Sequence, residues 1–245
     1  MQIPGEITKA FNDELFGIIN PKESGDEIQY DPKKAMHIIF ERIFALGEIN
    51  EIESEIKTML GRLGTINNFI FKTYSIEELV IGVKHYLIAW STMKDLMTNM
   101  INVCFDLGIH ETDLSFGVVM RNKKVKNSNI PNIIREHQSS INVKYTDKQR
   151  NDAIHRGKLL DDEINEFRSK YNKLFSRKYG LLNPDPISDE EFESEHKKLN
   201  LELKGLVESK KHEYSAHYEK TIALNIEIAK ELAKVTANAV LENRI

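Results

Sequence analysis

Arg150, Asn151 and His155 are the residues whose types and spacing could perform chemistry together. Histidine has an unperturbed pKa of about 6.5 and can exchange a proton near neutral pH. Arginine stays charged and offers a fork of donors that matches phosphate oxygens. These residue types suit proton transfer beside a phosphate group.

A short helix is predicted to carry these residues. Thr146, followed three residues later by Gln149, forms a capping box that starts a helix, and Gly157 is typical of the left-handed residue that ends one. Arg150 and His155 would share this helix of about three turns, with His155 near its C-terminal end. Residues five apart on an ideal helix diverge by about 140°, so the two side chains do not project side by side.

Positive charge gathers around the same helix. Residues 121 to 158 hold ten basic and three acidic side chains, a balance of +7 in a chain whose formal net charge is −4. Such a segment marks where a polyanion would be drawn, although lysines that merely solvate a loop would give the same count. The candidate binding residues in this segment are Arg121, Lys123, Lys124, Lys126, Lys144, Lys148, Arg156 and Lys158.

The sequence Arg-Asn-Asp-Ala-Ile-His, followed by Arg-Gly-Lys, resembles the Arg-polar-x-x-x-His signature of HEPN domains (higher eukaryotes and prokaryotes nucleotide-binding). The resemblance covers about residues 71 to 245. It implies a metal-independent endoribonuclease in a toxin–antitoxin, phage-defence or RNA-processing setting. In that reaction a ribose 2′-hydroxyl attacks the adjacent phosphate, His155 moves the proton, and Arg150 stabilises the developing charge. No cofactor and no metal are expected.

The resemblance also implies a homodimer in which two copies of the motif line one cleft. That arrangement would resolve the angular divergence of Arg150 and His155, with Asn151 supporting the arginine or the interface. A curled arginine stem or a distortion near Gly157 would resolve it as well. Alternatively, His155 is only a helix C-terminal histidine favoured by the helix dipole.

Helical signals dominate the rest of the chain. Asp31-Pro32, Ser75 and Ser188 are predicted helix starts, and the apolar stripe from Leu79 to Cys104 predicts a central buried helix. Residues 113–129 lose this periodicity and are expected to form a loop or a short strand pair. The stretch from Ser188 onward would be about 80 Å long as one helix, so a bend is expected near Gly205 or at residues 209–211.

These patterns predict an all-α fold, an antiparallel bundle of long helices with an N-terminal helical extension. Residues 1–70 are expected to form an arm and helical extension packed on the core, and residues 71–245 the HEPN-like bundle. The single cysteine, Cys104, excludes an intrachain disulfide, and no run is long enough to span a membrane. The chain is expected to be cytoplasmic.

Other charged groups are interpreted more simply. His212 and His217 are five apart rather than the four that a zinc-protease helix requires, so a solvated helix face is the better interpretation. Glu51, Glu53 and Glu55 are expected on exposed helix faces.

Three functional readings remain open. The first is the ribonuclease, acting on single-stranded or loop RNA, with an antitoxin or a nucleotidyltransferase as a further candidate partner. The second is a non-catalytic scaffold of the same fold that binds RNA, a nucleotide or a protein. The third is a structural adaptor that interacts through residues 188–245.

Overall fold

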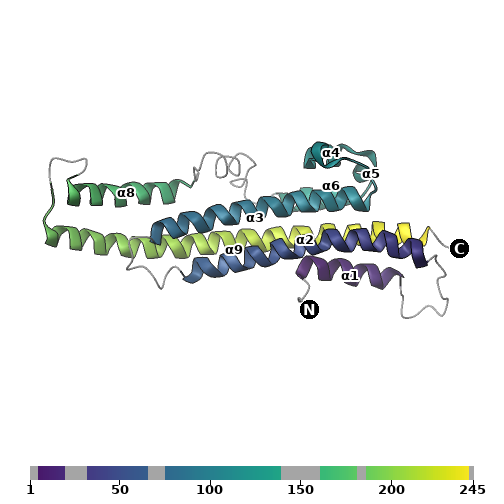
Figure 1. Cartoon of the computed structure of the whole chain (residues 1–245), viewed down its shortest axis with the longest axis horizontal. Coiled ribbons are helices and arrows are strands. Elements are labelled where there is room, and N and C mark those ends of the chain that lie inside the picture. Colours follow the sequence, from purple (N-terminus) through teal and green to yellow (C-terminus); the bar gives the residue numbers. More distant parts are fainter. Residues whose placement is uncertain (1–4, 20–31, 66–74, 139–160, 181–185, 243–245) are drawn as a thin grey trace. The chain divides into compact units, whose positions relative to one another are not determined.

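The computed structural model of the chain describes residues 5–19, 32–65, 75–138, 161–180 and 186–242 (Figure 1). Within these residues the structure contains eight α-helices, one 3₁₀ turn and no strand. The predicted all-α fold is therefore confirmed. The helices are α1 (Glu6–Ile19), α2 (Pro32–Thr65), α3 (Ser75–Cys104), α4 (Phe116–Arg121), α5 (Lys123–Lys126), α6 (Ile130–Gln138), α8 (Asp162–Tyr179) and α9 (Asp189–Leu241), with the 3₁₀ turn at Glu111–Asp113.

Three predicted helix starts are confirmed. Helix α2 begins at Pro32 and α3 begins at Ser75. Helix α9 begins directly after Ser188, whose hydroxyl accepts the Glu191 N–H at 3.1 Å. These starts could be predicted because a cap is a contact between residues close together in sequence. The fourth predicted start, Thr146, lies outside the described residues.

The chain forms two compact units. Unit 1 comprises residues 1–55, 89–142 and 217–245, and unit 2 comprises residues 56–88 and 143–216. Each of the helices α2, α3 and α9 has one part in unit 1 and the other part in unit 2. Each compact unit takes residues from both predicted domains, 1–70 and 71–245, so the units do not test that boundary. The boundary stays a prediction.

In unit 1, α1 packs along the first part of α2. Its buried side chains recur every four residues, at Ile7, Phe11, Leu15 and Ile19. The Glu53 carboxylate of α2, only 1% exposed, accepts the Glu6 N–H at 3.1 Å and so satisfies a free donor at the α1 N-terminus. Glu53 was expected on a solvated face, and that expectation is wrong because the α1 start covers it.

Two contacts in unit 1 show that α3 and α9 run in the same direction. The Trp90 indole donates to the Thr221 hydroxyl at 3.2 Å, and further along the Thr236 hydroxyl lies 3.9 Å from the Cys104 sulfur. Met93, Met97 and Met100 are buried on the α3 stripe between these contacts. The predicted central buried helix is therefore confirmed.

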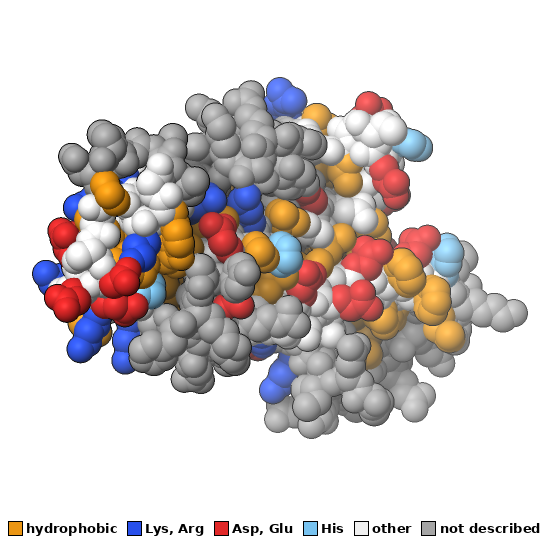
Figure 2. Space-filling model, turned by 60° about the vertical axis from the view of Figure 1, so that its left-hand side comes forward, with side chains coloured by type: hydrophobic (Ala, Val, Ile, Leu, Met, Phe, Trp, Pro, Cys, Tyr) orange, Lys and Arg blue, Asp and Glu red, His pale blue; other side chains and the backbone are white. Residues whose placement is uncertain are grey.

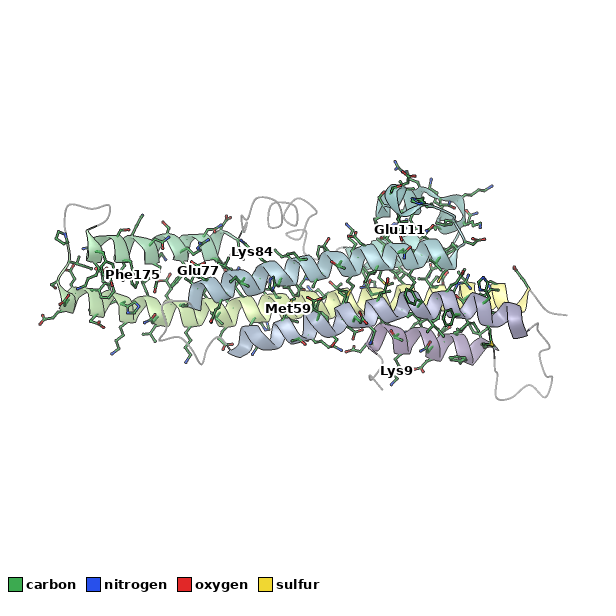
Figure 3. All side chains as sticks on the ribbon, viewed as in Figure 1. Lys9, Met59, Glu77, Lys84, Glu111 and Phe175 are labelled. Atoms are coloured by element: carbon green, nitrogen blue, oxygen red, sulfur yellow. The ribbon has the colours of Figure 1, made fainter. Side chains whose placement is uncertain are left out.

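In unit 2, α8 and the first part of α9 lie antiparallel (Figure 1). Lys170 pairs with Glu202 at 2.6 Å and Arg177 with Glu195 at 3.4 Å, so higher numbers on α8 meet lower numbers on α9. Figure 3 labels Phe175 on α8. Its ring contacts the Phe192 ring edge-on, with 5.3 Å between ring centroids. Alternating ionic and aromatic contacts thus fix the register of the two helices.

Two expectations about secondary structure are wrong. In place of the expected loop or short strand pair, residues 113–129 contain the short helices α4 and α5. Ser115 caps α4, of six residues, and Asn122 caps α5, of four, and both helices are too short to show periodicity. Helix α9 continues through Gly205 and residues 209–211 without a bend. Its inner face stays buried across that region, at Leu203, Val207, Lys210 and Tyr214.

Candidate functional site

The three predicted catalytic residues, Arg150, Asn151 and His155, lie outside the described residues. The same holds for the predicted RNA-binding residues Lys144, Lys148, Arg156 and Lys158. Two described parts of the chain are relevant to the candidate site. Asp161 is the first described residue after the motif, and the other four predicted RNA-binding residues lie on α4 and α5.

Asp161 is the N-cap of α8 and stands six positions after His155 in the sequence. One of its carboxylate oxygens, Oδ1, accepts the Ile164 N–H at 3.1 Å. The other, Oδ2, lies 2.8 Å from the Lys210 ammonium and accepts the Tyr214 hydroxyl at 3.4 Å. One side chain thus starts α8 and ties that start to α9 within unit 2.

Lys210 is the centre of this network. Its side chain is 2% exposed, and its ammonium also lies 2.9 Å from Glu163 and 3.0 Å from Glu213. Burial disfavours the charged ammonium, but the hydrogen bonds to these carboxylates outweigh burial and raise the pKa of Lys210 above its ordinary value. The lysine is therefore charged at neutral pH.

Sequence reasoning placed Lys210 at a helix bend and missed this role. A signal existed in the spacing of α9. Leu203, Val207, Lys210, Tyr214 and His217 follow one another at intervals of three or four residues, which places them all on one helix face. A charged residue inside such an apolar series predicts a buried ion pair, because a buried charge needs a partner.

The four described basic candidates lie together in unit 1. Arg121 ends α4, and Lys123, Lys124 and Lys126 belong to the single turn of α5; all four are exposed. The Lys124 ammonium contacts the carbonyl oxygens of Phe105 and Asp106, at 3.0 and 2.9 Å. Lys124 thus caps the C-terminal end of α3, where a cation is favoured by the helix dipole.

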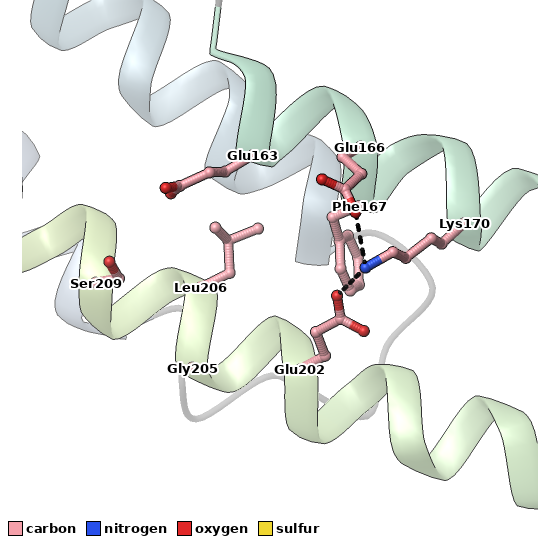
Figure 4. A pocket seen from close by; sticks show the side chains of 8 residues that line it. All are labelled: Glu163, Glu166, Phe167, Lys170, Glu202, Gly205, Leu206 and Ser209. Atoms are coloured by element: carbon pink, nitrogen blue, oxygen red, sulfur yellow. Dashed lines mark hydrogen bonds and ion pairs between the residues drawn. The ribbon is translucent and has the colours of Figure 1, made fainter.

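A cleft of about 280 Å³ lies between α8 and α9 in unit 2 (Figure 4). Lys170 crosses it and bonds Glu202 at 2.6 Å and Glu166 at 3.2 Å, above a floor that includes Phe167 and Leu206. With Glu163 the lining carries three carboxylates and one ammonium. That balance disfavours the phosphate backbone of a nucleic acid.

His217 was expected on a solvated face, and the structure corrects this. Its side chain is 4% exposed in unit 1, and its ring lies 5.2 Å from the Trp90 ring in an edge-on contact. Burial, with a smaller contribution from the Lys220 charge, lowers the pKa of His217 to about 4. The histidine is therefore neutral near pH 7.

The described residues contain neither a metal-binding cluster nor a helix suited to a membrane. No group of three histidine, cysteine, aspartate or glutamate side chains there is arranged to hold a metal ion. Among the described helices, none combines the length and the apolar character needed to cross a membrane.

The described helices are long, run side by side and make ionic contacts with one another. This architecture places the protein in the class of α-helical bundle proteins. Residues 76–220, 145 of the 245 residues, match the family described as Cthe2314-like HEPN. The chain belongs to this family and contains a HEPN-type domain. No curated protein and no solved structure matches the chain.

Proposed function

We propose that the protein is a metal-independent endoribonuclease of the HEPN type. The observation that carries this proposal is the family match over residues 76–220, a range that includes the Arg150, Asn151 and His155 positions. Histidine supplies a proton carrier near neutral pH and arginine a fixed positive charge for phosphate. These are the two groups that 2′-hydroxyl attack on a phosphate requires.

The Asp161 network supports the proposal from the described part of the chain. Asp161 follows the motif segment directly, and its carboxylate is held by a buried lysine and a tyrosine of α9. A segment that must present catalytic groups benefits from a fixed attachment, because small displacements of such groups cost large factors in rate. Arg121, Lys123 and Lys126 would add attraction for RNA on α4 and α5.

The proposal includes a homodimer with both motifs in one cleft, and a cytoplasmic role in defence or in a toxin–antitoxin pair. An antitoxin or a nucleotidyltransferase is the partner that such a setting would supply. The competing function is a HEPN-type scaffold that binds RNA or a nucleotide without cleaving it.

The decisive experiment compares purified wild-type protein with His155→Ala on a mixed RNA pool in the presence of a chelator. The wild type should cleave RNA, spare DNA of the same sequence, and leave cyclic or 3′ phosphates. His155→Ala and Arg150→Ala should each lower the rate by roughly two to four orders of magnitude. Arg150→Lys should recover little, because an ammonium lacks the bidentate fork.

Circular dichroism and unfolding curves provide the control, since a folded but inactive variant is required. Equal cleavage by wild type and His155→Ala would reveal a contaminating nuclease. Absence of cleavage by wild type across RNA pools, with RNA binding retained, would favour the scaffold.

A further inference from the structure

The first described turns of α2, within unit 1, expose four large hydrophobic side chains. Met36 is 71% exposed, Phe40 70%, Ile43 47% and Phe44 68%. Their spacing places them on one side of the helix. In the space-filling view, hydrophobic side chains reach the surface beside acidic and histidine side chains (Figure 2). We call Met36, Phe40, Ile43 and Phe44 the α2 stripe.

The α2 stripe is large for a surface in contact with water. At about 200 Å² for each such side chain, it exposes roughly 500 Å², near the upper end of the largest apolar patch on a typical monomer. Pairing two stripes would bury roughly 1,000 Å² in total, the lower bound for a specific protein interface.

Gly47 extends the stripe by one further turn. A Cβ atom at Gly47 would meet nothing within 4 Å, so no contact inside the chain requires a glycine there. Glycine in a helix interior is less favourable than alanine. Gly47 lies on the same side of α2 as the stripe and has no side chain. It therefore leaves room for a large side chain of a partner molecule.

Acidic side chains follow the stripe along α2. Glu48 and Glu51 are both exposed there. A parallel partner helix of the same sequence would bring each of these carboxylates beside its own copy, and like charges repel. A partner helix that ran in the opposite direction would keep the two acidic pairs at opposite ends of the contact.

We infer that the α2 stripe is an interface with a second copy of this chain, in which the two α2 helices pack antiparallel about a two-fold axis near residues 41 and 42. In that register Met36 meets Gly47 of the second copy, and Phe40 meets Ile43. Glu48 and Glu51 of one copy lie at the opposite end of the contact from Glu48 and Glu51 of the other. The two-fold axis makes every contact occur twice, so the same stripe forms the interface on both copies.

This interface goes beyond the proposed function. Residues 36–48 lie before the family match at residues 76–220 and do not include the catalytic candidates. A dimer formed through the motif and a contact formed through α2 can exist in the same assembly. The test must therefore report on α2 directly.

Cysteine cross-linking on the full-length chain provides that report. The natural thiol, Cys104, is 2% exposed, and burial raises its pKa to about 11 although the Arg42 charge lowers it, so the wild type is an unreactive background. Two Ile43→Cys positions would lie close to the axis, about 5 Å apart along the helices, whereas two Glu51→Cys positions would lie roughly 28 Å apart. A short bifunctional maleimide should join the first pair and leave the second unjoined.

Each outcome is informative. Cross-linking of both variants would indicate parallel pairing and overturn the antiparallel register. Cross-linking of neither, with both thiols labelled by a monofunctional maleimide, would overturn the interface and leave the stripe to a different protein. Cross-linking in a protein that shows no ribonuclease activity would sustain the interface while counting against the proposed function.

Sedimentation of charged variants supplies the second measurement. Phe40→Glu changes a side chain that is 70% exposed, so the fold should be retained, while the dissociation constant of the assembly should rise by at least about tenfold. Leu201→Glu is the matched control, because Leu201 is 68% exposed on α9 in unit 2. An assembly mass unchanged by Phe40→Glu would overturn the inference.

Discussion

Lys210 joins three carboxylates in unit 2, and its burial decides how much that contact contributes. Removal of this ammonium, 2% exposed, would leave the Asp161 carboxylate, 11% exposed, poorly solvated and without its cation, whereas Glu163 is open to water. Exposed ion pairs on the same two helices contribute far less, because water and salt screen them.

Lys210→Met should therefore lower the free energy of unfolding by about 3 kcal/mol, the scale for breaking a buried ion pair. Asp161→Asn should cost less, because asparagine retains the N-cap and Glu163 and Glu213 still hold the lysine. Lys170→Met, which removes an exposed ammonium from the same helix pair, should leave the denaturation midpoint close to that of the wild type. Urea unfolding followed by circular dichroism measures all three. Equal losses for Lys210→Met and Lys170→Met would contradict this account.

His217 gives unit 1 a dependence on pH. Its folded-state pKa of about 4 lies below the unfolded value of about 6.5, so the unfolded chain binds a proton first as the pH falls. Stability should decrease as the pH is lowered from 6.5 toward 4, by up to about 3 kcal/mol from this residue. His217→Phe, which keeps a ring beside Trp90, should reduce that loss when unfolding is measured at pH 7 and pH 4.5. His212→Gln, an exposed change on the same helix, is the control and should leave the pH dependence intact.

At the scale of the elements, two glycines distinguish a continuous helix from a helix end. Gly205 lies inside α9 and a Cβ there would meet nothing within 4 Å. Gly180 follows α8 with φ of 66°, the left-handed conformation that a side chain disfavours, and its N–H donates to the Ser176 carbonyl. The same substitution should therefore have opposite effects at the two positions.

Gly205→Ala should stabilise the protein by roughly 0.5–1 kcal/mol, because alanine favours a helix interior. Gly180→Ala should destabilise it by roughly 1–2 kcal/mol, because the left-handed conformation is strained for alanine. Thermal unfolding of the two variants beside the wild type provides the measurement. A loss of stability in Gly205→Ala would indicate that α9 bends at that residue after all.

At the scale of the whole molecule, the proposed composite site predicts that activity depends on assembly. Specific activity should be constant at high protein concentration and should fall as the protein is diluted below its dimer dissociation constant. Fluorescence-detected sedimentation over the same dilution series checks that both changes occur together. Activity that stays constant through the conversion to monomer would rule out a site shared by two copies. The Phe40→Glu variant separates the α2 contact from the contact around the motif. Its ribonuclease activity should persist if the motif residues form their own interface.

The sequence by itself determined the features that depend on near neighbours. Pro32, Ser75 and Ser188 mark helix starts because a cap contacts residues within one turn. The apolar stripe from Leu79 to Cys104 marked the buried helix because its period is a local property. The catalytic candidates Arg150, Asn151 and His155 also come from sequence, and their geometry lies outside the described residues.

Only the tertiary structure decided the roles of charged residues on helix faces. Glu53 is buried because the α1 start lies over it, and Lys210 is buried because Asp161 approaches from α8. His217 is neutral because the Trp90 ring of α3 covers it. In each case the covering group comes from another helix, at least 45 positions away in the sequence. A helical pattern shows which face a residue occupies, but the desolvation and pairing of its charge depend on what packs against that face.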